Sequence, residues 1–164
     1  MNKLMLTAIV SAVAFCCFAG PAASKGGKGM TWVKFRHDSL TGTDHVGCDN
    51  GITCNAYTGD TACKVALPVL CRKNDNSPNP GVPTDFYNGW KKGHIATTMP
   101  ISGTALTSQA VADQICAATF GRGWVMADFH HPEGGWSWSS FGNARTDTRY
   151  WVRIRDQPAN CWNP

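Results

Sequence analysis

The stretch "GGWSWSSFGNARTDTRYWVRIRDQPANCW" (134–162) carries most of the information about fold and function in this chain. It holds four tryptophans, a tyrosine and four arginines. Large aromatic side chains either fill the core of a small domain or wall a binding pocket. Within the stretch, residues 150–155 alternate between two faces, which predicts a strand. One face carries Tyr150, Val152 and Ile154, and the other carries Trp151, Arg153 and Arg155.

The tryptophans are expected to divide between core and surface. Trp136 and Trp138 are two residues apart, so on an extended segment their side chains point to the same side. Glycine and serine flank them, and we expect this pair to be exposed. Trp124 and Trp162 border apolar segments and are expected in the core.

A candidate ligand-binding face follows from the same stretch. Asn143, Arg145, Asp147 and Arg149 alternate, so on a strand they would share one side and could hydrogen-bond the hydroxyls of a sugar stacked on nearby tryptophans. The predicted ligand-binding residues are Trp136, Trp138, Asn143, Arg145, Asp147 and Trp151. In the alternative interpretation, the tryptophans fill a small core and the charges pair on the surface.

Residues 1–24 have the pattern of a secretory signal peptide. Lys3 precedes an apolar run over 4–18, and small residues follow at 19–24. A retained anchor is the alternative, but the run is shorter than the roughly 20 apolar residues that a span needs. We therefore expect an exported protein, periplasmic or extracellular, without a membrane span in the mature chain. A flexible basic lead is expected over 25–30.

The charge of the chain is mild and scattered. Lysine and arginine number 15 against 11 acidic residues, and no basic stripe gathers them into a nucleic-acid footprint. Nucleic acid is therefore not an expected partner. The roughly 140 residues after the signal peptide suit one domain.

The cysteine pattern predicts disulfides, because an even number remains in an exported chain. The six are Cys48, Cys54, Cys63, Cys71, Cys116 and Cys161. Four lie within 48–71, where short loops favour the local bridges Cys54–Cys63 and Cys48–Cys71. A zinc site is the alternative, but it needs closer pairs, such as C-x-x-C.

The predicted fold class is α+β: a small disulfide-stapled domain of mixed or antiparallel strands with one main helix. That helix is expected at about 106–120, in "LTSQAVADQICAATFGRG" (106–123), with Thr107 or Ser108 as its cap and Gly121 at its end. Helical spacing predicts a buried face of Val111, Ala112, Ile115, Cys116, Thr119 and Phe120. Strands are expected at 31–36, 65–71, 90–98, 124–127 and 150–155, and loops over 38–63.

A proline- and asparagine-rich segment, "NDNSPNPGVP" (74–83), divides the mature chain. We interpret residues 31–164 as one domain with two lobes. The first, 31–73, holds cysteine-rich loops and strands, and the second is 84–164. Pro68 within the apolar run 65–71 indicates an edge strand or a bulge there.

The second lobe resembles a shortened C-type lectin-like domain over residues 85–162 at most. The resemblance rests on a strand, a helix carrying Cys116, "GWVMADF" (123–129), "YWVRI" (150–154) at the position of the family's "WIGL"-type core strand, and a terminal cysteine. That fold joins its first helix to its last strand, so the resemblance implies a Cys116–Cys161 bridge. The chain is also similar to short exported bacterial proteins sharing "CNAYTGDTAC" (54–63), "GRGWVMADFH" (121–130) and "DQPANCW" (156–162).

The calcium site of the lectin family is not expected here. The family uses Glu-Pro-Asn or Gln-Pro-Asp followed by Trp-Asn-Asp, whereas this chain has Gln157-Pro158-Ala159 and ends in Trp162-Asn163-Pro164. Calcium needs several oxygen ligands, carboxylates among them, and no such cluster is visible. No cofactor or metal is therefore predicted.

A second candidate site is "DFHHPEGG" (128–135). Asp128, His130, His131 and Glu133 would suit a transition metal or acid–base work. Adjacent histidines on an extended segment point apart, however, and a solvated turn is the alternative. No G-x-S-x-G frame holds a nucleophilic serine.

These features favour a secreted, disulfide-bonded binding module for a glycan or a protein surface, acting without calcium. One alternative is a small secreted hydrolase that uses His130 or His131. The other is a structural or surface-assembly component. An enzyme is the less favoured class, because the sequence offers no nucleophile, base and orienting group in a known arrangement.

Overall fold

The computed structural model describes residues 27–49, 51–130 and 135–164. The predicted signal peptide (1–24), the first two residues of the predicted lead (25–26), and both His131 and Glu133 lie outside these residues. The rest of the predicted flexible lead is ordered instead: it contains the strand Lys28–Gly29 and the buried Met30. The described elements are β1 (Lys28–Gly29), β2 (Thr31–Asp38), β3 (Thr43–Gly47), β4 (Thr61–Ala62), β5 (Ala66–Leu67), β6 (Leu70–Asn74), β7 (Asn88–Thr97), β8 (Ile101–Ser102), a 3-10 turn (Gly103–Ala105), α1 (Gln109–Phe120), β9 (Val125–Met126), β10 (Ser137–Phe141) and β11 (Tyr150–Trp151).

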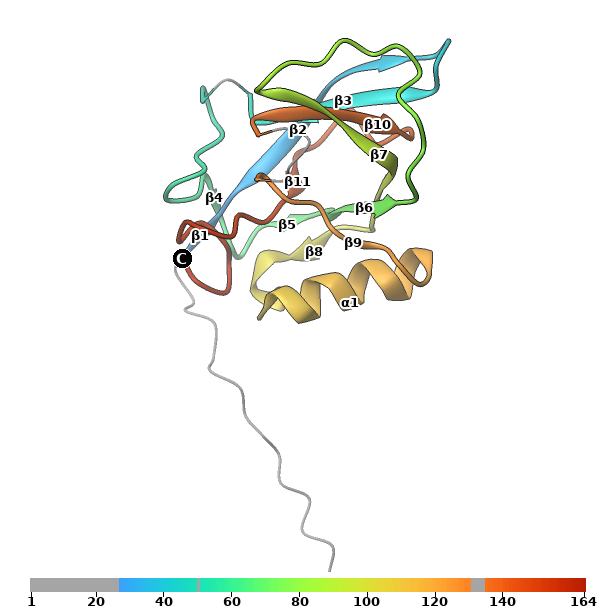
Figure 1. The fold of residues 1–164 in the computed structure, drawn as a ribbon. Helices are drawn as coiled ribbons and strands as arrows, with labels where there is room; N and C mark the ends of the chain where they lie inside the picture. Colours follow the sequence, from blue (N-terminus) through green and yellow to red (C-terminus); the bar gives the residue numbers. More distant parts are fainter. Residues whose placement is uncertain (1–26, 50, 131–134) are drawn as a thin grey trace, which may run out of the picture.

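A seven-stranded mixed sheet forms most of the molecule (Figure 1). Its order is β11-β2-β3-β10-β7-β6-β9. The β10–β7 pair is parallel and the other neighbouring pairs are antiparallel. One α-helix, α1, lies against β9 in the described part of the chain. The predicted class, a small α+β domain with mixed strands and disulfides, is confirmed at this level.

The two ends of this sheet meet and close it. Parallel bridges join Val69 to Trp151 and Asp128 to Arg153. The backbone N–H of Arg153 also donates to the carbonyl oxygen of Ala127 at 3.0 Å. Closure satisfies backbone groups that an open edge would leave unpaired. It also separates the side chains of each strand into an interior set and an outer set.

Aromatic side chains fill the interior. Trp32 and Trp138 are both fully buried, with ring centroids 5.5 Å apart, and Phe129 lies 5.9 Å from Trp32. The expectation that Trp138 is exposed is therefore wrong. The small residues on either side of Trp138 lie on the outer face of the strand, while the Trp138 ring fills the inside of the closed sheet. Trp136 is half-buried at the rim of this interior and packs on Phe129, with ring centroids 5.0 Å apart.

A second core lies between the sheet and α1. Trp151 is 1% exposed there, so it too is a core residue rather than part of a binding face. Trp124 and Trp162, expected in the core, are partly buried against the same cluster. Of the predicted helix face, Ala112 and Cys116 are buried, and Thr119 is exposed.

The helix boundaries follow the sequence signals. Ser108 is the N-cap, and its hydroxyl accepts a hydrogen bond from the backbone N–H of Val111 at 3.2 Å. Gly121 follows the last helical residue with φ 101°, a backbone conformation that favours glycine. Both predictions are confirmed.

Several strand predictions need correction. The segment 31–36 falls within β2, and the segment 90–98 falls within β7 except for its last residue. The segment 38–63, expected as loops, contains β3, a central strand of the sheet. Pro68 interrupts the apolar run 65–71, as its missing N–H predicts, but the β6 part of that run lies inside the sheet.

The sheet does not separate at residues 74–83. Strands β2 and β3 from the first half lie between β11 and β10 from the second half. The predicted lobes 31–73 and 84–164 therefore share one sheet and one interior.

All six cysteines are oxidised, as predicted, but every predicted pairing is wrong. The bridges are Cys48–Cys54, Cys63–Cys161 and Cys71–Cys116. Cys116 of α1 faces β6, which carries Cys71, rather than the end of the chain. Because closure of the sheet brings the C-terminal segment beside residues 27–30 and 63, Cys161 meets Cys63.

A buried carboxylate stands where the sheet closes. Asp128 is 0% exposed and accepts hydrogen bonds from Arg72 at 3.1 Å, Arg153 at 3.0 Å and Arg155 at 2.7 Å. Arg153 also pairs with Asp113 of α1 at 3.0 Å. Burial acts to raise the pKa of Asp128, but the three guanidinium groups, Arg153 first, outweigh it and hold the pKa below its ordinary value.

We expect Asp128→Asn to destabilise the fold strongly. The amide keeps the size of the side chain but removes the charge that the buried Arg72 and Arg153 face, and breaking a buried ion pair in this way typically costs about 3–5 kcal/mol. Chemical denaturation measures the loss. Asp147→Asn, which breaks the exposed pair with Arg145, is the matched control and should change stability little.

The pH dependence gives this prediction a second readout. A carboxylate with a lowered folded pKa stabilises the fold above its ordinary pKa of 3.8, and this contribution disappears as the pH falls through the folded pKa. Wild-type stability should therefore fall more steeply in acid than that of Asp128→Asn. Parallel stability curves for the two proteins would contradict the ionic role of Asp128.

Candidate binding groove

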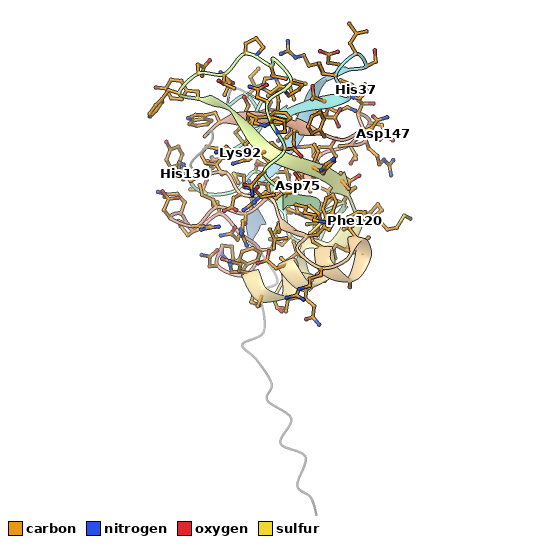
Figure 2. All side chains as sticks on the ribbon, turned by 45° about the vertical axis from the view of Figure 1, so that its right-hand side comes forward. His37, Asp75, Lys92, Phe120, His130 and Asp147 are labelled. Atoms are coloured by element: carbon orange, nitrogen blue, oxygen red, sulfur yellow. A yellow bond between two sulfur atoms is a disulfide. The ribbon has the colours of Figure 1, made fainter. Side chains whose placement is uncertain are left out.

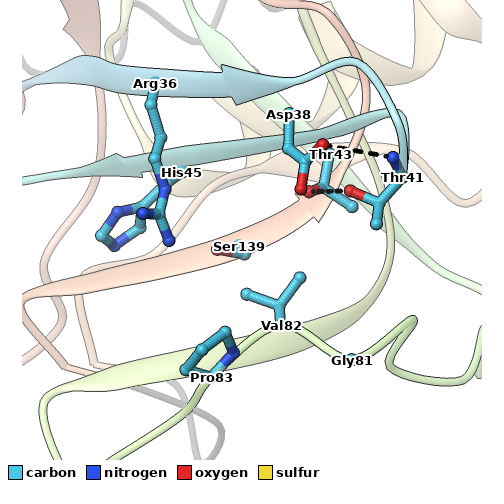
Figure 3. A pocket seen from close by; sticks show the side chains of 9 residues that line it. All are labelled: Arg36, Asp38, Thr41, Thr43, His45, Gly81, Val82, Pro83 and Ser139. Atoms are coloured by element: carbon cyan, nitrogen blue, oxygen red, sulfur yellow. Dashed lines mark hydrogen bonds between the residues drawn. The ribbon is translucent and has the colours of Figure 1, made fainter.

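Three adjoining hollows lie over the outer face of β3, and all are lined by Arg36 and His45. We call them together the β3 groove. The largest has a volume of about 540 Å³. Figure 3 shows the end of the groove that lies opposite the largest hollow. There, Val82 and Pro83 lie across from Arg36 and His45. The groove thus runs between the end of β2 and the segment before β7.

A β-bulge in β2 directs two consecutive side chains toward the groove. Lys34 pairs with Val46 and Arg36 pairs with His45, so Phe35 is the extra residue. In a regular strand, neighbouring side chains point to opposite faces. The bulge removes this alternation, and both Phe35 and Arg36 line the largest hollow.

Gly47 at the end of β3 allows the groove wall to pack closely. A Cβ atom there would lie 2.5 Å from Cβ of Ser137 and 2.8 Å from the Phe35 ring. Any larger residue would push the ring away. Phe35 also contacts the His45 ring edge-on, with centroids 5.1 Å apart, which fixes one aromatic wall.

A hydrogen-bonded turn builds the facing wall. The carboxylate of Asp85 accepts the backbone N–H of Tyr87 at 2.7 Å and the side-chain amide of Asn88 at 2.7 Å. The carbonyl oxygen of Tyr87 in turn accepts the backbone N–H of Ser137 at 3.1 Å. These contacts hold Tyr87 at the rim with 56% of its surface exposed, while its neighbour Phe86 is 86% exposed.

A chain of polar groups crosses the floor. His45 Nε2 lies 2.7 Å from the hydroxyl of Ser137, which donates its proton to Asn88 Oδ1. The amide of Asn88 is oriented by its N–H bond to Asp85, so its oxygen faces the serine. The single hydroxyl proton is therefore committed to Asn88, and His45 acts as the donor. Among the residues that the structure describes, Ser137 consequently has no base within reach.

His45 carries no charge at neutral pH. Burial and then the charge of Arg36 lower its pKa below the ordinary value of 6.5, and Asp85 opposes them only in part. The floor thus presents neutral hydrogen-bonding groups, and Arg36 supplies positive charge at its side.

The predicted ligand-binding face does not form. Of its six residues only Trp136 lines the groove. Residues 142–149 are not a strand, so Asn143, Arg145 and Asp147 share no face: Asn143 accepts a bond from Lys34 at 3.1 Å, and Arg145 pairs with Asp147 at 2.6 Å.

The two described members of the predicted histidine site, Asp128 and His130, have separate environments. His130 is exposed and pairs with Asp156 at 3.3 Å, whereas Asp128 is buried among arginines. Figure 2 shows His130 and Asp147 on opposite sides of the molecule.

Among the described residues, one group has metal-ligand geometry: Cys48, Asp49 and Cys54. The two sulfurs are bonded to each other and offer no thiolates. Asp49 accepts the backbone N–H groups of Thr53 and Cys54 at 3.1 and 2.7 Å. This cluster is a disulfide-held turn.

Sequence reasoning missed most of the groove, namely Phe35, Arg36, His45, Tyr87, Asn88 and Ser137. One local signal was available: "TDFYNG" (84–89) places two aromatics among turn-forming residues. Nothing local indicates that β2, β3 and the segment 81–88 enclose a common surface.

No protein-family model, curated protein or solved structure matches the chain. The resemblance to C-type lectin-like domains therefore stays a prediction. None of the helices in the described part of the chain is long and apolar enough to cross a membrane.

We expect Ser137 to be inert toward fluorophosphonates, because His45 donates to its oxygen rather than removing its proton. Intact-mass measurement after incubation with the probe should show no adduct, with a known serine hydrolase labelled in parallel. A single adduct that disappears in Ser137→Ala would contradict this assignment of protons.

Proposed function

We propose that this protein is an exported, disulfide-bonded binding module that holds a glycan in the β3 groove without calcium. The observation that carries the proposal is a set of three aromatic rings from separate segments around one hollow. Phe35 comes from β2, Tyr87 from the turn before β7, and Trp136 from the residue before β10. Aromatic walls with a few placed polar groups characterise small-ligand sites.

The shape and chemistry of the hollow support a sugar. Its volume of about 540 Å³ lies within the range of small-ligand pockets. His45, Asn88 and Ser137 present neutral donors and acceptors along the floor. Sugars combine apolar ring faces with hydroxyls at the ring edge, so they match aromatic walls and a polar floor together.

Exposure of the aromatics supports binding rather than a purely structural role. Phe35 is 40% exposed and Tyr87 is 56% exposed, and both line the largest hollow. Neighbouring exposed aromatic rings at one cleft mark an interaction site. The other described large apolar residues at the surface, such as Leu40, Ile52 and Met99, do not line this groove.

Binding is favoured over hydrolysis because the described residues of the groove include no poised acid–base pair. Ser137 has no base among these residues. Asp85, a carboxylate that lines the groove, accepts the Asn88 amide and two backbone N–H groups. These hydrogen bonds, with that of Asn88 the largest, lower the pKa of Asp85, so it does not serve as an acid at neutral pH.

Export is part of the proposal. Three disulfides fit an oxidising compartment, periplasmic or extracellular. The signal-peptide pattern of residues 1–24 agrees with this.

A glycan array with the oxidised protein tests the proposal, followed by titration of the selected sugar. Tyr87→Ala should weaken its binding at least about tenfold, equivalent to about 1.4 kcal/mol, because it removes one stacking wall. Tyr57→Ala is the matched control, since Tyr57 is 59% exposed and lies outside the groove. Equal losses for both variants, or no sugar bound by the wild type, would contradict the proposal.

A further inference from the structure

Arg36 has an unusual position among the arginines of this protein. Its cross-strand partner is His45, and it lines every one of the three hollows of the β3 groove. Figure 3 shows its side chain beside the His45 ring, facing Val82 and Pro83. The residue is exposed, so a ligand in any part of the groove can reach its guanidinium group.

Most described arginines form ion pairs with aspartates. Those that do so are Arg72, Arg145, Arg149, Arg153 and Arg155. For Arg36 and Arg122, no carboxylate of the described residues lies within ion-pair distance. Arg122 lies after α1, outside the groove. In the described structure, the guanidinium group of Arg36 therefore has no carboxylate partner. Arg36 also lies in a cleft.

The two carboxylates that line the groove are engaged elsewhere. Asp38 accepts the backbone N–H groups of Leu40 and Thr41 at 2.9 and 3.4 Å, and so holds the β2–β3 turn. Asp85 holds the facing turn through Asn88 and backbone N–H groups. Both carboxylates thus have structural tasks at opposite walls, and His45 between them is neutral. The hydrogen bond from Leu40 and, more weakly, the charge of Arg36 lower the pKa of Asp38, but the side chains of Arg36 and Asp38 form no ion pair in the described structure, so the guanidinium donors of Arg36 are available to a ligand.

The chemistry of guanidinium selects the group that it would bind. Its planar N–H donors match the two oxygens of a carboxylate in a bidentate pair, which is shorter and stronger than a neutral hydrogen bond. In an acidic sugar the carboxylate projects from the edge of the ring. A ring stacked against Phe35, Tyr87 or Trp136 can therefore direct its carboxylate along the groove to Arg36.

We infer that the β3 groove selects glycans built from carboxylate-bearing sugars, with Arg36 as the residue that determines this specificity. The inference rests on the proposed function, because the aromatic walls must first hold a sugar ring. It goes further in naming the chemical class of the sugar and the contact that distinguishes it from neutral sugars.

Isothermal titration with paired oligosaccharides tests the inference. The probes are oligomers of galacturonate, mannuronate and glucuronate, each compared with its carboxyl-reduced neutral counterpart of equal length. We expect at least one acidic oligomer to bind the wild type at least tenfold more tightly than its reduced form. This preference should weaken with added salt, because exposed charges are screened.

Variants of Arg36 separate charge from shape. Arg36→Gln should abolish the preference for the acid, so that the acidic oligomer binds no more tightly than its reduced form. Arg36→Lys should recover only part of the preference, because lysine keeps the charge and loses the planar arrangement of donors. Arg122→Gln is the matched control and should bind like the wild type. Melting curves should coincide for all of these variants, since both arginines are exposed.

The outcomes distinguish the two proposals. If acidic and reduced oligomers bind equally and Tyr87→Ala weakens both, the glycan site stands and the inference about Arg36 is overturned. If a sulfated oligosaccharide without carboxylates binds as tightly as the best acid, the carboxylate specificity is overturned. If no sugar binds the wild type in either this experiment or the array, both proposals fail.

Discussion

The buried Asp128 carboxylate is the contact on which the rest of the structure depends. It joins Arg72 of β6 to Arg153 and Arg155 of the segment after β11, so a single side chain links the two ends of the sheet. Through Asp113, Arg153 extends the network to α1. A buried charge is tolerated only when its partners surround it, and here those partners come from segments that must meet for the sheet to close.

Closure then determines which side chains are available for function. On β10, Trp138 faces the interior and packs on Trp32, while Ser137 and Ser139 line the outer groove. On β3, His45 lies between the buried residues Asp44 and Val46 and faces the same groove. Apart from Trp136 at the rim of the groove, the large aromatic side chains of the C-terminal stretch therefore stabilise the fold. The candidate site uses small and polar side chains from the outer face, together with aromatics at the rim.

Local patterns predicted the features that depend on neighbouring residues. The cap at Ser108, the end of α1 at Gly121 and the cysteine oxidation follow from short-range chemistry. The disulfide partners and the groove do not, because closure and the bulge at Phe35 depend on pairing between distant strands. The alternation over 143–149 was misleading for a related reason: a strand pattern forms a face only if another strand pairs with it.

The most direct test of the binding groove is amide NMR of the labelled, oxidised protein during titration with an oligosaccharide that it binds. The account predicts that the largest chemical-shift changes fall on Phe35, His45, Tyr87 and Ser137, at opposite walls and on the floor of one groove. Changes centred instead on residues 143–147 would contradict this account and favour the face that alternation in the sequence predicted.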